Sequence, residues 1–204
     1  MYKSLASRLS CKLINLEIIP EEKKNICSYG LEVFFSSITY SVIFLLIGYI
    51  TSTFICSIVF FGGFYFIRHF SGGLHADTYF KCHLFFSINY LIVVMLLHIV
   101  PTDMYYAIIL SVLCFCVVSI FVFAPVDHKN KRFIKTEYKR FKIRSRIYAV
   151  LLLILGVFVT FNVISCNKHI LSFSFGTISA TISMLGAKIL NYLERRKSDY
   201  VQES

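Results

Sequence analysis

Residues 105–124 read YYAIILSVLCFCVVSIFVFA, an uninterrupted apolar run without Asp, Glu, Lys or Arg. A transmembrane α-helix needs about 20 predominantly apolar residues, with a range of about 17–25. Five further apolar runs flank this one along the chain, at residues 33–50, 53–67, 85–100, 148–165 and 170–190. The sequence therefore predicts an all-α, polytopic membrane protein with six transmembrane helices.

The overall composition agrees with a membrane protein. Hydrophobic residues make up 57% of the chain, charged residues make up 16%, and the mean hydropathy is +0.70. Soluble domains contain about 45–50% apolar and about 25% charged residues. A soluble core of this size has no room for so much apolar surface, so the composition excludes an ordinary soluble domain.

Basic residues lie almost entirely on one side of the predicted membrane domain. The net charge is +10, and segments 1–30, 68–84, 125–147 and the tail from residue 188 carry 20 of the 21 Lys and Arg residues. Six spans place these four segments on the same side, which the positive-inside rule makes cytoplasmic. We therefore expect a multi-pass protein of the cell membrane with both termini in the cytoplasm and with no nucleic-acid partner.

This arrangement defines the expected domain organisation. Residues 1–30 form a cytoplasmic segment, residues 31–193 form the membrane domain, and residues 194–204 form a tail. In the first segment, leucines at 5, 9, 13 and 16 recur at helical spacing. This pattern predicts an amphipathic helix that lies on the membrane lipids or packs on the membrane domain. Pro20 and the two acidic residues after it predict a second helix start.

The polar segment 68–84, between the second and third spans, holds the candidate chemistry. Ionisable groups at a membrane edge tend to mark function. Cys82 and His75 form a candidate nucleophile and base. Thiolates are stabilised by nearby cations and helix N-termini, and Arg68 and Lys81 are the cations of this segment.

The spacing of His75 and Cys82 constrains the backbone between them. In one continuous helix, seven residues would separate them by about 10.5 Å along the axis, too far for a hydrogen bond. Gly72 and Gly73 permit a break in the helix, because glycine adopts conformations closed to other residues. We therefore expect His75 on a loop that folds back over the start of a helix bearing Cys82.

Other interpretations of these polar residues stay open. His69, His75, Cys82 and His83 contain zinc-ligand types, but their spacing matches none of the usual patterns. Asp77 either orients the imidazole or begins a helix. Cysteines inside apolar runs, at 56, 114 and 116, are typical of small hydrophobic side chains, and His69 and His83 fit packing or interfacial roles.

The motif Arg68-x-x-x-Gly72-Gly73-x-His75, with Cys82 seven residues later, resembles the signature of the accessory gene regulator B family of membrane peptidases. The segment 124–131, which reads APVDHKNK, is similar to the second motif of that family, although Arg132 stands where the family often has proline. Residues 29–32 also resemble the family. The similarity covers nearly the whole chain.

The resemblance implies a cysteine endopeptidase that processes a quorum-sensing peptide precursor and closes the product into a ring. It assigns the catalytic roles to His75 and Cys82; we expect no cofactor and no metal. The residues expected to bind substrate or support catalysis are Arg68, Gly72, Gly73, Asp77, Lys81, Pro125, Asp127, Lys129 and Lys131.

The expected partner is a small amphipathic propeptide with an acidic C-terminal part. The basic loop from Lys129 to Arg146 suits such a partner, and the guanidinium of Arg68 can bind a carboxylate with two hydrogen bonds. The positive-inside rule alone also explains a basic loop. A six-span transporter or permease without covalent chemistry, and a sensor or scaffold, are the competing functions. The sequence is compatible with a homodimer but does not define the oligomeric state.

Overall fold

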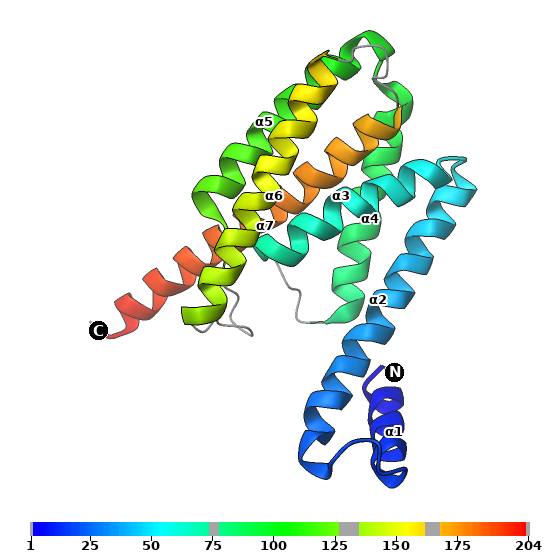
Figure 1. Cartoon of the computed structure of the whole chain (residues 1–204), viewed down its shortest axis with the longest axis vertical. Coiled ribbons are helices and arrows are strands. Elements are labelled where there is room, and N and C mark those ends of the chain that lie inside the picture. The colour runs from blue at the N-terminus through cyan, green and yellow to red at the C-terminus, as the bar shows by residue number, and fades with distance from the viewer. Residues whose placement is uncertain (1, 74–77, 127–134, 162–167, 203–204) are drawn as a thin grey trace. The chain divides into compact units, whose positions relative to one another are not determined.

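The structure is a computed structural model that describes residues 2–73, 78–126, 135–161 and 168–202. These residues form helices and contain no strand, which confirms the prediction of an all-α membrane protein (Figure 1). In chain order the helices are α1 (Tyr2–Asn15), η1 (Glu21–Lys23), α2 (Lys24–Ile50), α3 (Phe54–Ser71), α4 (Tyr79–Ile99), η2 (Thr102–Met104), α5 (Tyr105–Phe123), α6 (Lys135–Phe161) and α7 (Lys168–Gln202).

Among the described residues, four helical segments are long and apolar enough to cross a membrane: Glu21–Ile50, Phe54–Ser71, Thr102–Phe123 and Lys168–Glu194. A shorter apolar helix, His83–Ile99, covers the third predicted run. The fifth run begins inside α6, whose first half is basic, and its end reaches residues that are not described. The count of six spans therefore stays a prediction.

The chain divides into two compact units, Met1–Ile47 and Gly48–Ser204. In the first unit, α1 confirms the predicted N-terminal helix, and η1 begins after Pro20 as expected. Leu5 and Leu9 remain exposed on α1. Whether this apolar face lies on lipid or on the membrane domain stays a prediction.

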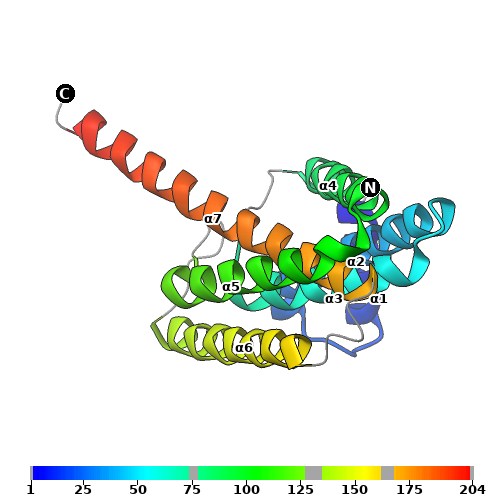
Figure 2. The same ribbon diagram turned by 90° about the horizontal axis from the view of Figure 1, so that it is seen from above.

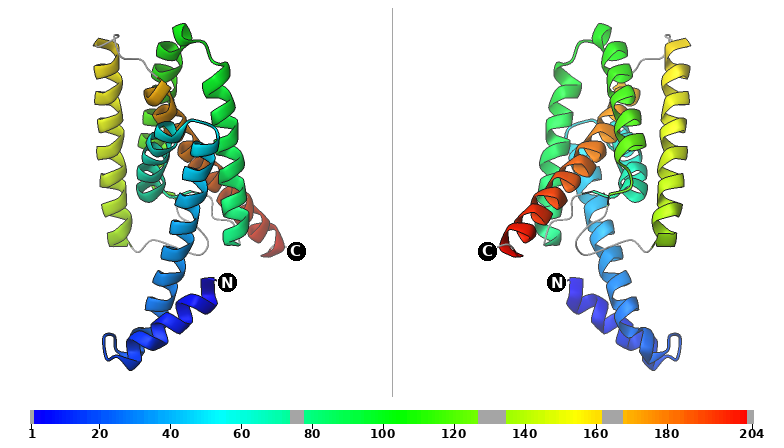
Figure 3. Two further views of the ribbon diagram at one scale, coloured as in Figure 1. Left: turned by 90° about the vertical axis from the view of Figure 1, so that its right-hand side faces the viewer. Right: turned by 90° about the vertical axis from the view of Figure 1, so that its left-hand side faces the viewer.

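In the second unit, α7 is the central helix. Figure 2 shows α7 between α4 on one side and α5 on the other, with α6 packed outside α5. Figure 3 shows α7 crossing the neighbouring helices obliquely. In an 18-residue apolar stretch of α7, within Lys168–Glu194, 61% of the residues are buried. The helix is therefore positioned to hold the other elements of this unit together.

Small residues allow α3 and α7 to pack closely where they cross. A Cβ atom added at Gly176 would lie 2.2 Å from the main-chain oxygen of Phe60, closer than atoms can approach. Glycine at such a crossing lets two membrane helices come into backbone contact. Aromatic pairs then join α3 to α4: the ring centroids are 5.0 Å apart for Phe60 and Tyr90 and 4.7 Å apart for Phe64 and Phe86. This packing sets the position of the C-terminal end of α3.

Candidate active site

The helix is interrupted between α3 and α4, at the point where the sequence predicts a break. Helix α3 ends at Ser71, and α4 begins at Tyr79. Gly72 has a φ of 78° and Gly73 has a φ of 148°. Both values lie in the region that favours glycine. The predicted use of the two glycines to leave the helix is therefore confirmed.

The first residues of the second motif segment, 124–126, lie against this break. The main-chain N–H of Val126 donates a hydrogen bond to the main-chain oxygen of Ser71, at 3.0 Å. A Cβ atom at Gly72 would lie 2.4 Å from the oxygen of Val126. Pro125, one of the predicted supporting residues, is buried beside this contact. Residues that are more than fifty positions apart in the chain therefore meet at the end of α3.

Helix α6 also contacts the end of α3. The Ser145 hydroxyl is buried, and its one hydrogen is shared between two main-chain oxygens, that of Phe141 on α6 and that of Phe70 on α3, the latter at 3.3 Å. The last turn of α3 is thereby tied to α6. Nothing in the sequence pattern distinguishes Ser145 from a solvated residue of the basic loop.

Arg68 extends from the last turn of α3 towards α7. Its Nη1 donates a hydrogen bond to Ser183 Oγ at 2.8 Å, and its Cζ lies 5.7 Å from the centroid of the Phe86 ring on α4. Ser183 and Phe86 were not among the residues predicted from the sequence. A serine and a phenylalanine inside apolar helices look like ordinary packing residues, so no sequence signal marks them.

The first turn of α4 contains Cys82. Thr78 caps this helix, and its side-chain oxygen accepts a hydrogen bond from the main-chain N–H of Lys81 at 3.3 Å. Cys82 is the fourth residue of α4 and comes four residues before Phe86. Positions four residues apart share one face of a helix. The Cys82 position therefore lies on the same face as the ring that contacts Arg68.

Several predicted site residues lie outside the described part of the chain. They are His75, Asp77, Asp127, Lys129 and Lys131, together with the side chain of Cys82. The folding of His75 over Cys82 and the roles of these residues stay predictions. The zinc alternative includes His75 and Cys82 and is likewise untested, while the described residues contain no group of three metal-binding side chains.

Two sequence-based interpretations that assign no catalytic role, those of His69 and of the cysteines in α5, agree with the structure. The exposed His69 ring stacks on Tyr65, with centroids 5.8 Å apart, as expected for a packing or interfacial residue. Cys114 is exposed and Cys116 is buried, so the two thiols lie on different faces of α5. Neither observation points to a catalytic role.

A different cysteine and histidine are in contact at the other end of α3. Cys56 Sγ lies 3.5 Å from His169 Nδ1 on α7. Cys56 is only 4% exposed, and its main-chain oxygen accepts a hydrogen bond from Ser172 Oγ at 2.8 Å. The sequence analysis treated Cys56 as a small hydrophobic residue and missed its polar neighbour, which is more than one hundred positions away.

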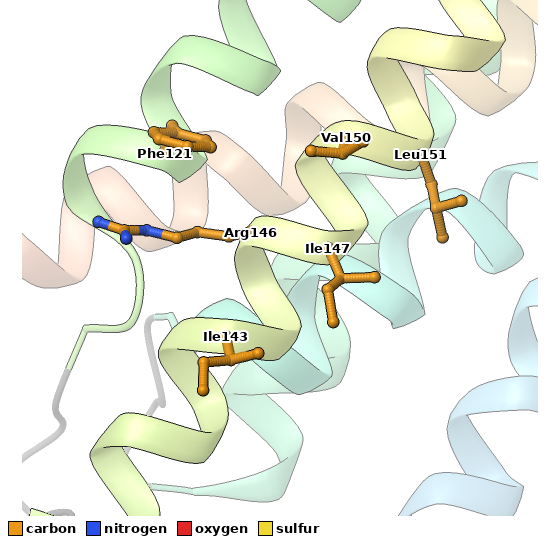
Figure 4. A pocket seen from close by; sticks show the side chains of 6 residues that line it. All are labelled: Phe121, Ile143, Arg146, Ile147, Val150 and Leu151. Atoms are coloured by element: carbon orange, nitrogen blue, oxygen red, sulfur yellow. The ribbon is translucent and has the colours of Figure 1, made fainter.

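An open groove of about 360 Å³ lies along α5 and α6 (Figure 4). Its lining is apolar except for Arg146, whose Cζ is 5.0 Å from the Phe121 ring centroid. The other lining residues are Ile143, Ile147, Val150 and Leu151. It offers no nucleophile and no acid or base, so we place the candidate active site at the break between α3 and α4 instead.

Comparison with known families gives a match over residues 3–185 to the family described as accessory gene regulator B. The match includes every predicted site residue. Comparisons with the curated proteins and with the solved structures give no match.

Proposed function

Because the chain belongs to the accessory gene regulator B family, and so takes part in the processing of a quorum-sensing peptide, we propose that it is a membrane cysteine endopeptidase. The proposed substrate is a small amphipathic precursor with an acidic C-terminal part. The enzyme removes this C-terminal part and promotes closure of the remaining peptide into a ring. His75 and Cys82 are the proposed catalytic residues.

One observation carries this proposal: the glycine break that ends α3 at Ser71 lets α4 start anew with Cys82 in its first turn. The N-terminus of a helix carries a partial positive charge that favours an anion, which suits a thiolate nucleophile. Because α3 ends at Ser71 and α4 begins at Tyr79, no single described helix contains both positions 75 and 82. The geometric objection to a His75–Cys82 pair in one continuous helix is thereby removed.

The proposed chemistry begins with proton transfer. The His75 imidazole takes the proton of the Cys82 thiol, and the thiolate attacks a peptide carbonyl near the C-terminal part of the precursor. As the tetrahedral intermediate collapses, the carbon–nitrogen bond breaks and the imidazolium returns its proton to the leaving amine. The N-terminal portion remains on Cys82 as a thioester.

Ring closure then uses the energy of the thioester. An internal cysteine or serine of the peptide attacks the thioester carbonyl, loses its proton to His75, and releases Cys82 as a thiolate. A nucleophile tethered within the same molecule reaches effective concentrations of about 10⁵–10⁸ M in favourable cases. A site that keeps water away therefore favours the ring over hydrolysis.

The orientation follows from the charge asymmetry and is also a proposal. With both termini in the cytoplasm, the catalytic segment lies at the inner leaflet, where the precursor is made. The positive residues of the 125–147 loop then face the same compartment as the acidic part of the substrate. Labelling of intact cells with a membrane-impermeant thiol reagent tests this, since Cys166 should react and Cys82 should not; the reverse pattern would overturn the orientation.

Co-expression with the precursor tests the proposed function. A short open reading frame beside the gene that encodes an amphipathic peptide with an acidic tail would be the precursor to co-express. Cys82→Ala should abolish cleavage at unchanged membrane levels, whereas Cys114→Ala, which removes an exposed thiol on α5, should cleave normally. Retained cleavage in Cys82→Ala would remove the nucleophile and favour a transporter or scaffold.

A further inference from the structure

The buried hydroxyl groups of α7 differ in what they bind. Thr177 Oγ1 donates to the oxygen of Ser174 and Thr181 Oγ1 donates to the oxygen of Thr177, at 2.7 and 2.8 Å, so both donate within their own helix, and Thr177 Oγ1 also accepts a hydrogen bond from the neutral Cys116 thiol on α5. Ser183 is 2% exposed, and its oxygen accepts a hydrogen bond from the guanidinium of Arg68 on α3. A hydrogen bond from a charged donor is stronger than one between neutral groups. Ser183 therefore fixes a cation rather than merely filling the helix interface.

Gly73 packs against the hydrogen bond between Arg68 and Ser183. A Cβ atom at this position would lie 1.8 Å from Arg68 Nη1 and 3.0 Å from Ser183 Oγ. The Nη1 atom is thus held between the glycine segment and α7. The absence of a side chain at Gly73 gives the guanidinium the room that it occupies.

Phe86 relates this guanidinium to the proposed nucleophile. Its ring lies 5.7 Å from Arg68 Cζ, and its position follows that of Cys82 by one turn on the same face of α4. Elements α3, α4 and α7 therefore converge on Arg68, which contacts α4 one turn after the Cys82 position.

We propose that Ser183 is a positioning residue that holds Arg68 as a carboxylate-binding subsite beside Cys82. The planar guanidinium forms paired hydrogen bonds with a carboxylate, and a fixed orientation lowers the entropy lost when the ligand binds. The natural ligand, an acidic side chain of the precursor, rests on the proposed function. The subsite itself does not depend on cleavage.

Alkylation by two small reagents tests the subsite in the full-length protein. Iodoacetate and iodoacetamide carry the same reactive carbon, but only iodoacetate carries a carboxylate. The rate at each cysteine is measured by mass spectrometry, and the iodoacetate-to-iodoacetamide ratio at Cys82 is compared with that at Cys11, a half-buried thiol on α1. We expect the ratio to be about tenfold higher at Cys82, the effect of roughly one charged hydrogen bond, and to fall to that of Cys11 in Arg68→Gln.

The matched variants Ser183→Thr and Ser183→Val isolate the hydroxyl, because they have nearly the same shape. The Thr variant should keep the high ratio at Cys82, and the Val variant should lower it several-fold. Equal ratios in the two variants, or a wild-type ratio at Cys82 no higher than at Cys11, would overturn the proposal. Equal slowing of both reagents in the Val variant, with the ratio unchanged, would overturn it too. Failure of the proposed function would appear separately, as cleavage of the precursor by Cys82→Ala.

Discussion

The two ends of α3 differ in how a cysteine is placed there. At the N-terminal end, Cys56 and His169 are 3.5 Å apart, but the thiol is buried between α3 and α7. At the C-terminal end, the helix is broken by glycines, and Cys82 lies in the first turn of a new helix. The comparison teaches that contact between a thiol and an imidazole does not by itself make a nucleophile. The thiol must also be reachable by a peptide, and a helix N-terminus must favour its anion.

The largest difference is expected between the two histidines. His75→Ala should lower cleavage of the co-expressed precursor by about 10²–10⁴-fold, the usual contribution of a general base. His169→Ala removes the imidazole beside Cys56 and should leave cleavage unchanged. Immunoblots of precursor and product, normalised to membrane levels of the enzyme, make the measurement. Normal processing in His75→Ala, or its loss only in His169→Ala, would reverse the assignment of the two ends.

A smaller effect is expected from the backbone of the break. Gly72→Ala places a Cβ against the oxygen of Val126 at a φ of 78°, which should destabilise the site by about 1–3 kcal/mol and reduce cleavage at least several-fold. Gly62→Ala is the matched control in α3, because a Cβ there meets nothing within 4 Å. Thermal stability in detergent and cleavage are measured for both variants. Wild-type behaviour of Gly72→Ala would show that the contact between the two motif segments is dispensable.

The smallest effect is expected at Cys56. Cys56→Ala should leave cleavage intact and lower stability by about 1 kcal/mol, as is typical of a modest change at a buried position. Its melting temperature and processing are compared with those of the wild type. A loss of processing in a variant that remains folded would mean that the buried pair takes part in the reaction, and the contrast between the two ends would fail.

The sequence predicts local features of this molecule well. Apolar runs predict the helices, because a bilayer requires long apolar segments. The Gly72-Gly73 pair predicts the break, because its backbone conformation is closed to other residues. Both signals arise from neighbouring residues and can be read without knowledge of the packing.

Contacts between distant segments were not predictable in the same way. Ser183 meets Arg68 across 115 positions, and Cys56 meets His169 across 113. A serine in an apolar helix has the same local pattern whether it bonds to its own backbone or holds a guanidinium on another helix. The packing of α3 against α7 brings Ser183 within reach of Arg68, and a single sequence does not specify how the two helices cross.

The most direct test is to detect the peptide on the enzyme. Purified protein is mixed with the precursor, quenched in acid and analysed by mass spectrometry. The account predicts a thioester that links Cys82 to the precursor without its C-terminal part, is released by hydroxylamine, and is absent in Cys82→Ala. Cleavage without any adduct at Cys82, or with the adduct on another cysteine, would contradict it.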